Sequence, residues 1–274
     1  MVFNPPERVA ALTPGWSGER AADGRPRVPD DLIERMHAVT NDEAWGVVEQ
    51  RHGYRYQFEG NWLNLHPDVT LVGRAVTAMM VPLRPDLHGV VQAAGEAEGR
   101  GGGQNTWVID TLTENDVLVV DLFGKVRDGT FIGDNLATAT CARAKTGIVI
   151  HGGIRDYQRV DELADFAVFC RGIDPSAIAE VTLVGVNVPI RIGNATVLPG
   201  DVVLGTPSGI TFVPPHLARE VVETSEDVRQ RDVFGKQRLA EGVYPSGRID
   251  VSTWEPDIEA DFEGWRAERT AAGR

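Results

Sequence analysis

The sequence has few of the features that mark membrane or secreted proteins. No apolar run approaches the roughly 20 residues that span a bilayer. The opening residues, MVFNPPERVAAL, show neither the basic stretch nor the apolar core of a signal peptide. Two cysteines, Cys141 and Cys170, are too few for a disulfide framework and suit a reducing compartment. We therefore expect a soluble cytoplasmic protein that does not interact with a membrane.

The chain also lacks an excess of basic residues. It has 27 Lys and Arg against 40 Asp and Glu, a net charge of -13. Nucleic-acid binding requires a basic face that neutralises phosphates, so this composition argues against nucleic acid as a main partner. A small anionic substrate remains compatible, because one local site can be positive on an acidic protein. With 274 residues and 42% hydrophobic content, the chain can bury the core of one large domain.

Several familiar catalytic motifs are missing. The six histidines show no HxH, HxxxH or HExxH spacing, so a dedicated zinc cage is not expected. The glycine-rich stretch GRGGGQ lacks the Lys-Ser/Thr pair of a phosphate-binding loop and the strand–turn–helix setting of a dinucleotide fingerprint. We interpret it as part of a flexible loop over residues 95–105.

Short strands dominate the centre of the chain, and helices lie between some strands and at the ends. This order predicts an α/β fold with a mixed, layered core and a C-terminal helix. The predicted domains are an N-terminal arm over 1–30, one domain over 31–242, and an extension over 243–274. In the extension, Trp254 and Trp265 are expected to dock an otherwise solvated segment onto the body. Periodicity predicts helices over 31–50, 86–97 and 215–242, and strands over 69–81, 116–124, 146–153, 165–170, 181–192 and 200–214.

One stretch, GDNLATATCARAKTGIVIHGGIRD, places an acid at Asp134 and an Arg-Asp pair at Arg155 and Asp156. After Asp134 a helix of about ten residues would run roughly 15 Å outward. The strand GIVIH would then return over roughly 16 Å. Helix out and strand back bring the three side chains to the same end of the layer. The backbone N–H groups at the helix start, at Asn135 and Leu136, would form an anion site there.

A purely structural interpretation is also open for these residues. Asp134 could serve only as a helix N-cap, and Arg155 and Asp156 only as an ion pair at a strand end. His151, before the two glycines, is more simply a core or supporting residue than a ligand. Spacing alone does not decide between these interpretations.

The stretch resembles the signature of a known family. That family contains the regulator of ribonuclease activity A and the 4-hydroxy-4-methyl-2-oxoglutarate aldolases (the HMG/CHA aldolases), and is called RraA-like. The shared pattern is Gly-Asp-x-Leu, then twenty residues between the Asp and an Arg-Asp pair, here GDNL and GGIRD in register. The segments LVGRAVTAMMV, DVLVVDLFG and VLPGDVVLGTPSGITFVPPHL also resemble family segments, so the resemblance covers roughly residues 32–242.

The resemblance implies a swivelling β/β/α-type fold and an assembly of trimers, or hexamers made of trimers. It also implies a metal-dependent aldolase that cleaves 4-hydroxy-2-oxo acids to pyruvate and a second oxo acid, with oxaloacetate decarboxylation as a further activity. The cofactor would be Mg²⁺ or Mn²⁺, a hard ion that accepts one protein carboxylate and several waters.

The family's site roles transfer to matching positions of this chain. Asp156 would bind the metal directly, and Asp134 would hold a metal-bound water. Arg155 would bind the C2 oxygen of the substrate, where it stabilises the charge of the developing enolate. The segment from Gly133, through the N–H groups of Asn135 and Leu136, would hold the pyruvyl carboxylate.

The sequence departs from the family pattern at three places. The compact aldolases lack the insertion near 95–106 and the tail after 243, so the second oxo acid cannot be transferred from them. They use an acid from the neighbouring subunit's C-terminal helix, for which Asp232 is the nearest match. The alternative function is a non-catalytic regulator that binds a protein partner, as some family members do. The complete Asp–Arg–Asp set favours the lyase.

Overall fold

The computed structural model describes residues 1–272, and the chain divides into two compact units, Met1–Val222 and Glu223–Arg274. The division falls inside helix α8 (Ala218–Ala240). Each unit has its own hydrophobic core. Among the described residues no helix is both long enough and apolar enough to cross a membrane.

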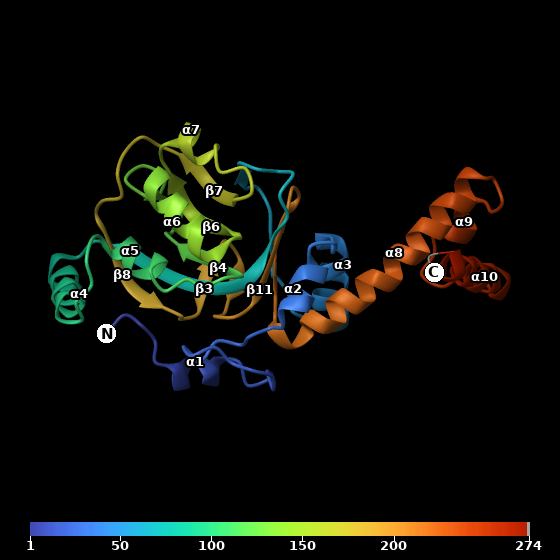
Figure 1. Cartoon of the computed structure of the whole chain (residues 1–274), viewed down its shortest axis with the longest axis horizontal. Helices are drawn as coiled ribbons and strands as arrows, with labels where there is room; N and C mark the ends of the chain where they lie inside the picture. Colours follow the sequence, from blue (N-terminus) through green and yellow to red (C-terminus); the bar gives the residue numbers. More distant parts are fainter. Residues whose placement is uncertain (273–274) are drawn as a thin grey trace. The chain divides into compact units, whose positions relative to one another are not determined.

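The first unit is built on a mixed sheet that is ten-stranded in the described part of the chain (Figure 1). Its centre is parallel, because β3, β4, β6 and β7 run in the same direction. The order across the sheet is β1 (Phe58–Glu59), β12 (Gly209–Val213), β11 (Val202–Thr206), β3 (Leu71–Pro82), β4 (Asp116–Asp121), β6 (Gly147–Ile154), β7 (Ala167–Ile173) and β2 (Leu63–Asn64).

Three further strand pairings complete the first unit. β5 (Thr130–Ile132) pairs with β6 in parallel, and β8 (Val181–Val186) pairs with β3 in the antiparallel sense. β9 (Ile190–Ile192) and β10 (Ala195–Val197) form a separate hairpin. The α/β class with a mixed sheet and a C-terminal helix, predicted from the sequence, is confirmed.

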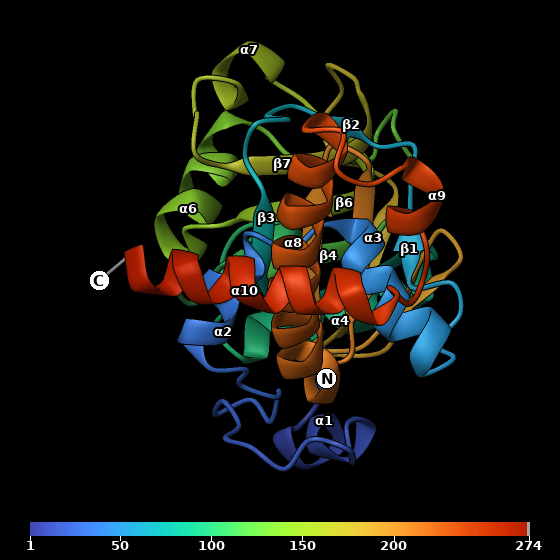
Figure 2. The same cartoon turned by 90° about the vertical axis from the view of Figure 1, so that its right-hand side faces the viewer.

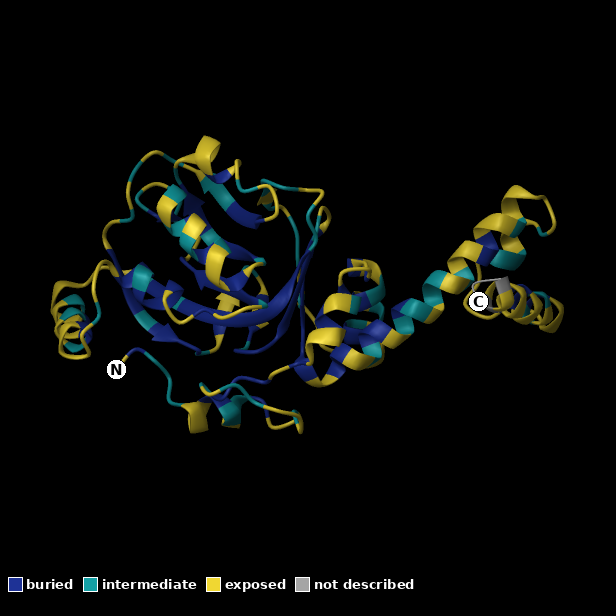
Figure 3. Ribbon diagram, in the orientation of Figure 1, coloured by how far each residue is buried: buried dark blue, intermediate teal, exposed yellow. Residues whose placement is uncertain are grey.

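The central strands are buried on both faces, as Figure 3 shows. In β6, Ile148, Ile150 and Ile154 join one core cluster, whereas Val149 joins the cluster on the opposite face. Alternation of this kind is what the pleat of a strand dictates. The near-continuous apolar run of β6 is therefore typical of a parallel strand covered on both sides.

Helices border the sheet within the first unit. Helix α6 packs on β6, since Ala137 and Ala144 share a core cluster with Ile148 and Ile150 (Figure 1). The helices before α8 are α1 (Pro6–Leu12), α2 (Asp30–Met36), α3 (Asn41–Trp45) with a π-helical continuation (Gly46–Arg51), α4 (Pro85–Ala97), α5 (Gln104–Ile109), α6 (Asp134–Ala144) and α7 (Tyr157–Val160).

Two predicted elements are split in the structure. The helix expected over 31–50 breaks at 37–40, because Thr40 and Glu43 form a capping box that starts α3 anew. The strand expected over 181–192 divides into β8 and β9, with Asn187 between them in the left-handed conformation (φ 55°). Part of the loop expected over 95–105 is helical, since α4 continues to Ala97.

The second unit consists of the later turns of α8, a short α9 (Ser246–Ile249) and α10 (Pro256–Ala272), which crosses α8 (Figure 2). The two tryptophans of the extension dock it onto α8, as expected, and most other described side chains of α10 are exposed. Trp254 and Trp265 pack with Phe234 of α8 and with Ile258 and Phe262 in a core that belongs to this unit. Ion pairs from Arg231 to Glu259 and from Arg238 to Asp261 flank that core.

Candidate active site at the start of helix α6

The three motif side chains lie at the carboxyl end of β6, where helix α6 begins. β5 leads into Gly133, which precedes the first helical residue, Asp134. The helix ends at Lys145, whose left-handed conformation (φ 58°) turns the chain back into β6. Arg155 follows directly after β6, and its backbone N–H bonds to the carbonyl of Ile132 at 3.0 Å. The structure therefore brings both ends of the motif together.

Asp156 is the residue on which the contacts converge. Its Oδ2 lies 3.4 Å from the backbone nitrogen of Asp134 and 3.6 Å from Nε of Arg155. Its backbone is in the left-handed region (φ 55°), which is uncommon for a residue other than glycine and occurs often at functional sites. The side chains of Arg155 and Asp156 are 43% and 36% exposed, so a ligand can reach both.

The absence of a side chain at Gly133 makes this convergence possible. A Cβ atom at Gly133 would lie 2.3 Å from Oδ2 of Asp156 and 3.0 Å from Nε of Arg155. The first distance is shorter than real Cβ contacts, and the second is tighter than most of them, so the Asp156 side chain would have to move. The glycine of the GDNL sequence is therefore required by space, since its own φ of -119° is accessible to any residue.

The first amides of α6 differ in availability. The Asp134 N–H points to Asp156, and the Asn135 N–H bonds to Oδ1 of Asp134 at 2.8 Å. Within the described chain, Leu136 N–H has no acceptor, whereas the next amide, of Ala137, bonds to Gly133. An incoming carboxylate would find the Leu136 N–H open and would have to displace the Asp134 side chain to bind Asn135 N–H.

The donor set at this point fits a hard divalent cation. Both contacts to Oδ2 of Asp156 are long, and its Oδ1 has no partner in the described structure, so the carboxylate keeps most of its acceptor capacity. Asp134 contributes a second carboxylate nearby. One or two carboxylates with several waters is the set that Mg²⁺ accepts. Among the described residues, at this site or elsewhere, no cluster of three or more His, Cys, Asp or Glu side chains could hold a metal, so most ligands of a cation here would be waters.

Asp232 lies in the second unit, on α8, where it is exposed and paired with Lys236 at 3.3 Å. Its expected role as an acid supplied to a neighbouring subunit stays a prediction.

His151 lies against β4, with its Nδ1 3.6 Å from Oδ1 of Asp121 and its ring against Trp62. Sequence reasoning did not single out Asp121. The register of β4 and β6, in which the two residues are partners, could not be derived from the spacing.

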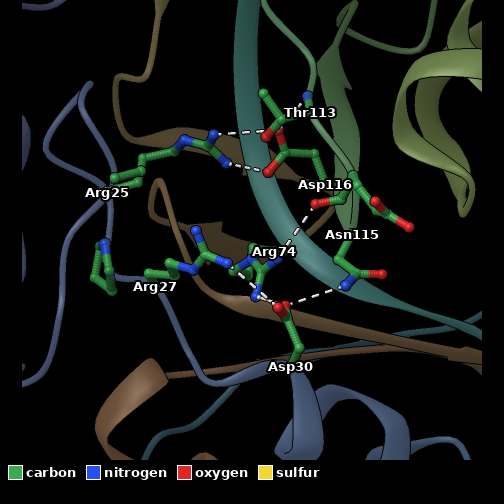
Figure 4. A pocket seen from close by; sticks show the side chains of 10 residues that line it. Arg25, Arg27, Asp30, Arg74, Thr113, Asn115 and Asp116 are labelled. Atoms are coloured by element: carbon green, nitrogen blue, oxygen red, sulfur yellow. Dashed lines mark hydrogen bonds and ion pairs between the residues drawn. The ribbon is translucent and has the colours of Figure 1, made fainter.

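A separate polar pocket of about 200 Å³ lies at the amino end of β4, away from this site (Figure 4). Its arginines already have internal partners. Arg25 makes two bonds to Asp116, at 2.7 and 3.2 Å, and Arg74 bonds to Asp30 and to the carbonyl of Val28. Arg25 and Asp116 are almost fully buried. We interpret this pocket as the anchor of the N-terminal arm.

Comparison with known proteins gives one family. A family model described as RraA-like, Aldolase/RraA, matches residues 38–212. A protein of Halalkalibacterium halodurans named "Putative 4-hydroxy-4-methyl-2-oxoglutarate aldolase" is 27% identical over 144 residues, which are 52% of this chain and 68% of that protein. Protein DlpA of Legionella pneumophila is 26% identical over 227 residues. The match covers 81% of this chain but only 33% of DlpA.

The fold is also similar to a solved structure. The crystal structure of RraAS2 of Streptomyces coelicolor, titled an unusual member of the RNase ES inhibitor RraA protein family, aligns with a TM-score of 0.66 at 27% identity. The alignment covers 77% of this chain and all of that one. The residues that the family model matches include the strand–helix–strand unit that carries the motif.

Proposed function

Because the chain belongs to the RraA-like family, Aldolase/RraA, we propose that it is a divalent-metal-dependent lyase. It would cleave a 4-hydroxy-2-oxo acid to pyruvate and a second oxo acid, and would also decarboxylate oxaloacetate. The observation that carries the proposal is the convergence of Asp134, Arg155 and Asp156 around the space left by Gly133. Relatives named as aldolases support the lyase class.

The residues present can perform the steps of this reaction. Asp156, with Asp134 beside it, would hold Mg²⁺ or Mn²⁺, which when bound supplies Lewis-acid polarisation at the substrate's carboxylate and C2 oxygen. The Leu136 N–H at the start of α6 binds the pyruvyl carboxylate, favoured by the positive end of the helix dipole. Arg155 places a fixed positive charge where the C2 oxygen becomes an enolate oxygen.

A proton must leave the 4-hydroxyl group, and one must return to the enolate carbon. In Asp134, Oδ1 is bonded to the Asn135 N–H. The other carboxylate oxygen has no partner in the described structure, and we expect it to hold a water that carries this proton. Asp134 would thus position the water rather than attack the substrate, which suits a half-buried acid at a helix start.

We also propose that the protein assembles as a homotrimer or as a hexamer of two trimers, with Asp232 completing the site of a neighbouring subunit. The support is the family membership and the position of Asp232 on α8. Light scattering on dilution, with activity followed in parallel, tests this. A fully active monomer would contradict it.

A regulator that binds a protein partner is the second candidate, favoured by the similarity to RraAS2. The deciding experiment measures pyruvate release from a panel of 4-hydroxy-2-oxo acids and oxaloacetate, before and after chelation. Turnover that disappears with chelator and returns with Mg²⁺ or Mn²⁺ supports the lyase. Asp156→Asn should then show no response to added metal. Full turnover by the chelated protein would exclude the metal, and no turnover on any substrate would favour the regulator.

A further inference from the structure

Arg127 is a cation that the family motif does not include. It lies in the loop that joins β4 to β5, and its side chain is exposed. Across the described residues it has no hydrogen bond or ion pair, only a through-space interaction with Asp174. Most exposed arginines of a protein move freely, so the surroundings of Arg127 must decide whether it has a role.

The backbone on either side of Arg127 is held firmly. Val126 packs so closely on two strands that a Cβ at Gly153 would lie 2.9 Å from its carbonyl oxygen, and one at Gly172 would lie 3.0 Å from its Cγ1. On the other side, the Asp128 N–H bonds to Oγ of Ser176 at 2.6 Å, and the Asp128 carbonyl accepts from Ala179. The loop thus presents Arg127 from a fixed base, which lowers the entropy cost of binding a ligand.

The packing of Val126 places Arg127 near the candidate active site, because Gly153, on which Val126 packs, is two residues before Arg155. Ile173 and Ile154 are register partners at the ends of β7 and β6, and the Asp174 N–H bonds to the Ile154 carbonyl at 3.0 Å. Asp174 is therefore the cross-strand neighbour of Arg155. Arg127 interacts electrostatically with this same acid.

Asp174 does not neutralise Arg127 by contact. Its carboxylate accepts the Ser176 N–H at 2.9 Å. Hydrogen bonds from Ser176 are the main reason that the pKa of Asp174 lies below its usual value, and the positive charge of Arg127 contributes less. The guanidinium of Arg127 therefore keeps its donors for a ligand at the edge of the sheet where Arg155 lies.

We propose that Arg127 is a specificity-determining residue that binds the second carboxylate of dicarboxylic 4-hydroxy-2-oxo acids. This inference rests on the proposed lyase function. The motif accounts for the pyruvyl half of the substrate and leaves any second anionic group without a cation. A guanidinium matches a carboxylate in a two-point hydrogen bond. Substrates that end in a methyl group gain nothing from it.

The test compares two substrates that share the pyruvyl half, 4-hydroxy-2-oxoglutarate and 4-hydroxy-2-oxopentanoate. In Arg127→Ala, kcat/KM for the dicarboxylate should fall about tenfold or more, the effect of losing a charged hydrogen bond. The value for the methyl-ended substrate should change less than about twofold. Arg191→Ala is the matched control, because Arg191 is an exposed arginine on β9, in the separate hairpin, and its loss changes net charge equally.

A binding measurement keeps the inference testable without turnover. Calorimetry with Mg²⁺ present would compare 2-oxoglutarate with 2-oxopentanoate, which differ only in the second carboxylate. Arg127→Ala should weaken the first about tenfold and leave the second unchanged. Equal effects on both ligands, or none, would overturn the role of Arg127. If the wild-type protein cleaves no substrate of the panel, the lyase function fails, and the calorimetric comparison still decides whether Arg127 recognises a second carboxylate.

Discussion

Asp156 and Asp134 are 22 residues apart in sequence, and the carboxylate of the first lies 3.4 Å from the backbone nitrogen of the second. The acid that we propose to bind the metal thereby lies at the positive end of helix α6. The arrangement depends on an arginine beside the acid and on a glycine before the helix, and each can be tested alone.

Arg155→Ala should lower kcat by about 10²–10³ and change KM little, because the C2 oxygen gains its full charge only in the transition state. Arg155→Lys should recover little, since an ammonium group cannot reproduce the planar fork. Steady-state pyruvate release, after a check that each variant folds, gives both constants. A sharp rise in KM at normal kcat would make Arg155 a ground-state binding residue.

Gly133→Ala should reduce turnover by about 10²-fold with the fold retained. The added methyl would displace the Asp156 carboxylate, and a shift of about 1 Å in a catalytic group costs a factor of this size. Gly89→Ala is the control, since a Cβ there meets nothing within 4 Å. That control should keep full activity and gain about 0.5–1 kcal/mol from helix propensity. Kinetics and denaturant unfolding of both variants are the measurements. Normal activity in Gly133→Ala would show that Asp156 need not sit where the structure has it.

Arg25→Met should destabilise the first unit by about 3–5 kcal/mol, because it leaves the buried carboxylate of Asp116 without its partner. The double variant Arg25→Met, Asp116→Leu should recover much of that loss. Arg84→Ala, which breaks an exposed pair with Asp86, should change the free energy of unfolding by less than about 1 kcal/mol. Guanidinium unfolding curves measure all three. Equal effects of Arg25→Met and Arg84→Ala would contradict an anchoring role for Arg25.

Asp201 predicts a dependence of stability on pH. Burial raises the pKa of its carboxyl group to about 7 from the usual value of 3.8. Below pH 3.8 both folded and unfolded forms are protonated. Between pH 3.8 and 7 only the folded form holds the proton, so its stabilising contribution is lost as pH rises through this window.

Asp201→Asn keeps a side-chain oxygen that accepts the Leu198 N–H, but the amide group does not gain or lose a proton in this pH range. The free energy of unfolding of this variant should therefore rise relative to wild type from pH 4 to 7, and the difference should then level off. Unfolding curves at several pH values measure it. A difference that does not change with pH would show that Asp201 does not titrate in that window.

The strand–helix–strand unit of the motif could be predicted because it is local. The rise per residue of a helix and of a strand predicts that the helix and the strand have similar lengths. Asp134 and Arg155 are therefore expected to lie at the same end of the layer. The Asp134 side chain accepts the Asn135 N–H, so this amide is not open to a substrate carboxylate as expected. The bond depends on the rotamer of Asp134, which residue spacing does not predict.

Features that depend on long-range pairing could not be predicted. Arg127 and Asp174 come near the site only through the register of β6 and β7 and the packing of Val126 on their glycines. Trp254 and Trp265 predicted that the tail is docked. Nothing in their local sequence, however, shows that their partner is Phe234 on α8. The division of the long helix between two cores likewise has no local signal.

The buried pair of Arg25 and Asp116 also has a consequence for synthesis of the chain. The two residues are separated by 91 positions. At about 5–20 residues per second, a ribosome would add the second about 5–18 s after the first. During that interval the arm cannot reach its final position, and Arg25 must remain hydrated. The N-terminal residues, although made first, therefore cannot become fixed before Asp116 has been added.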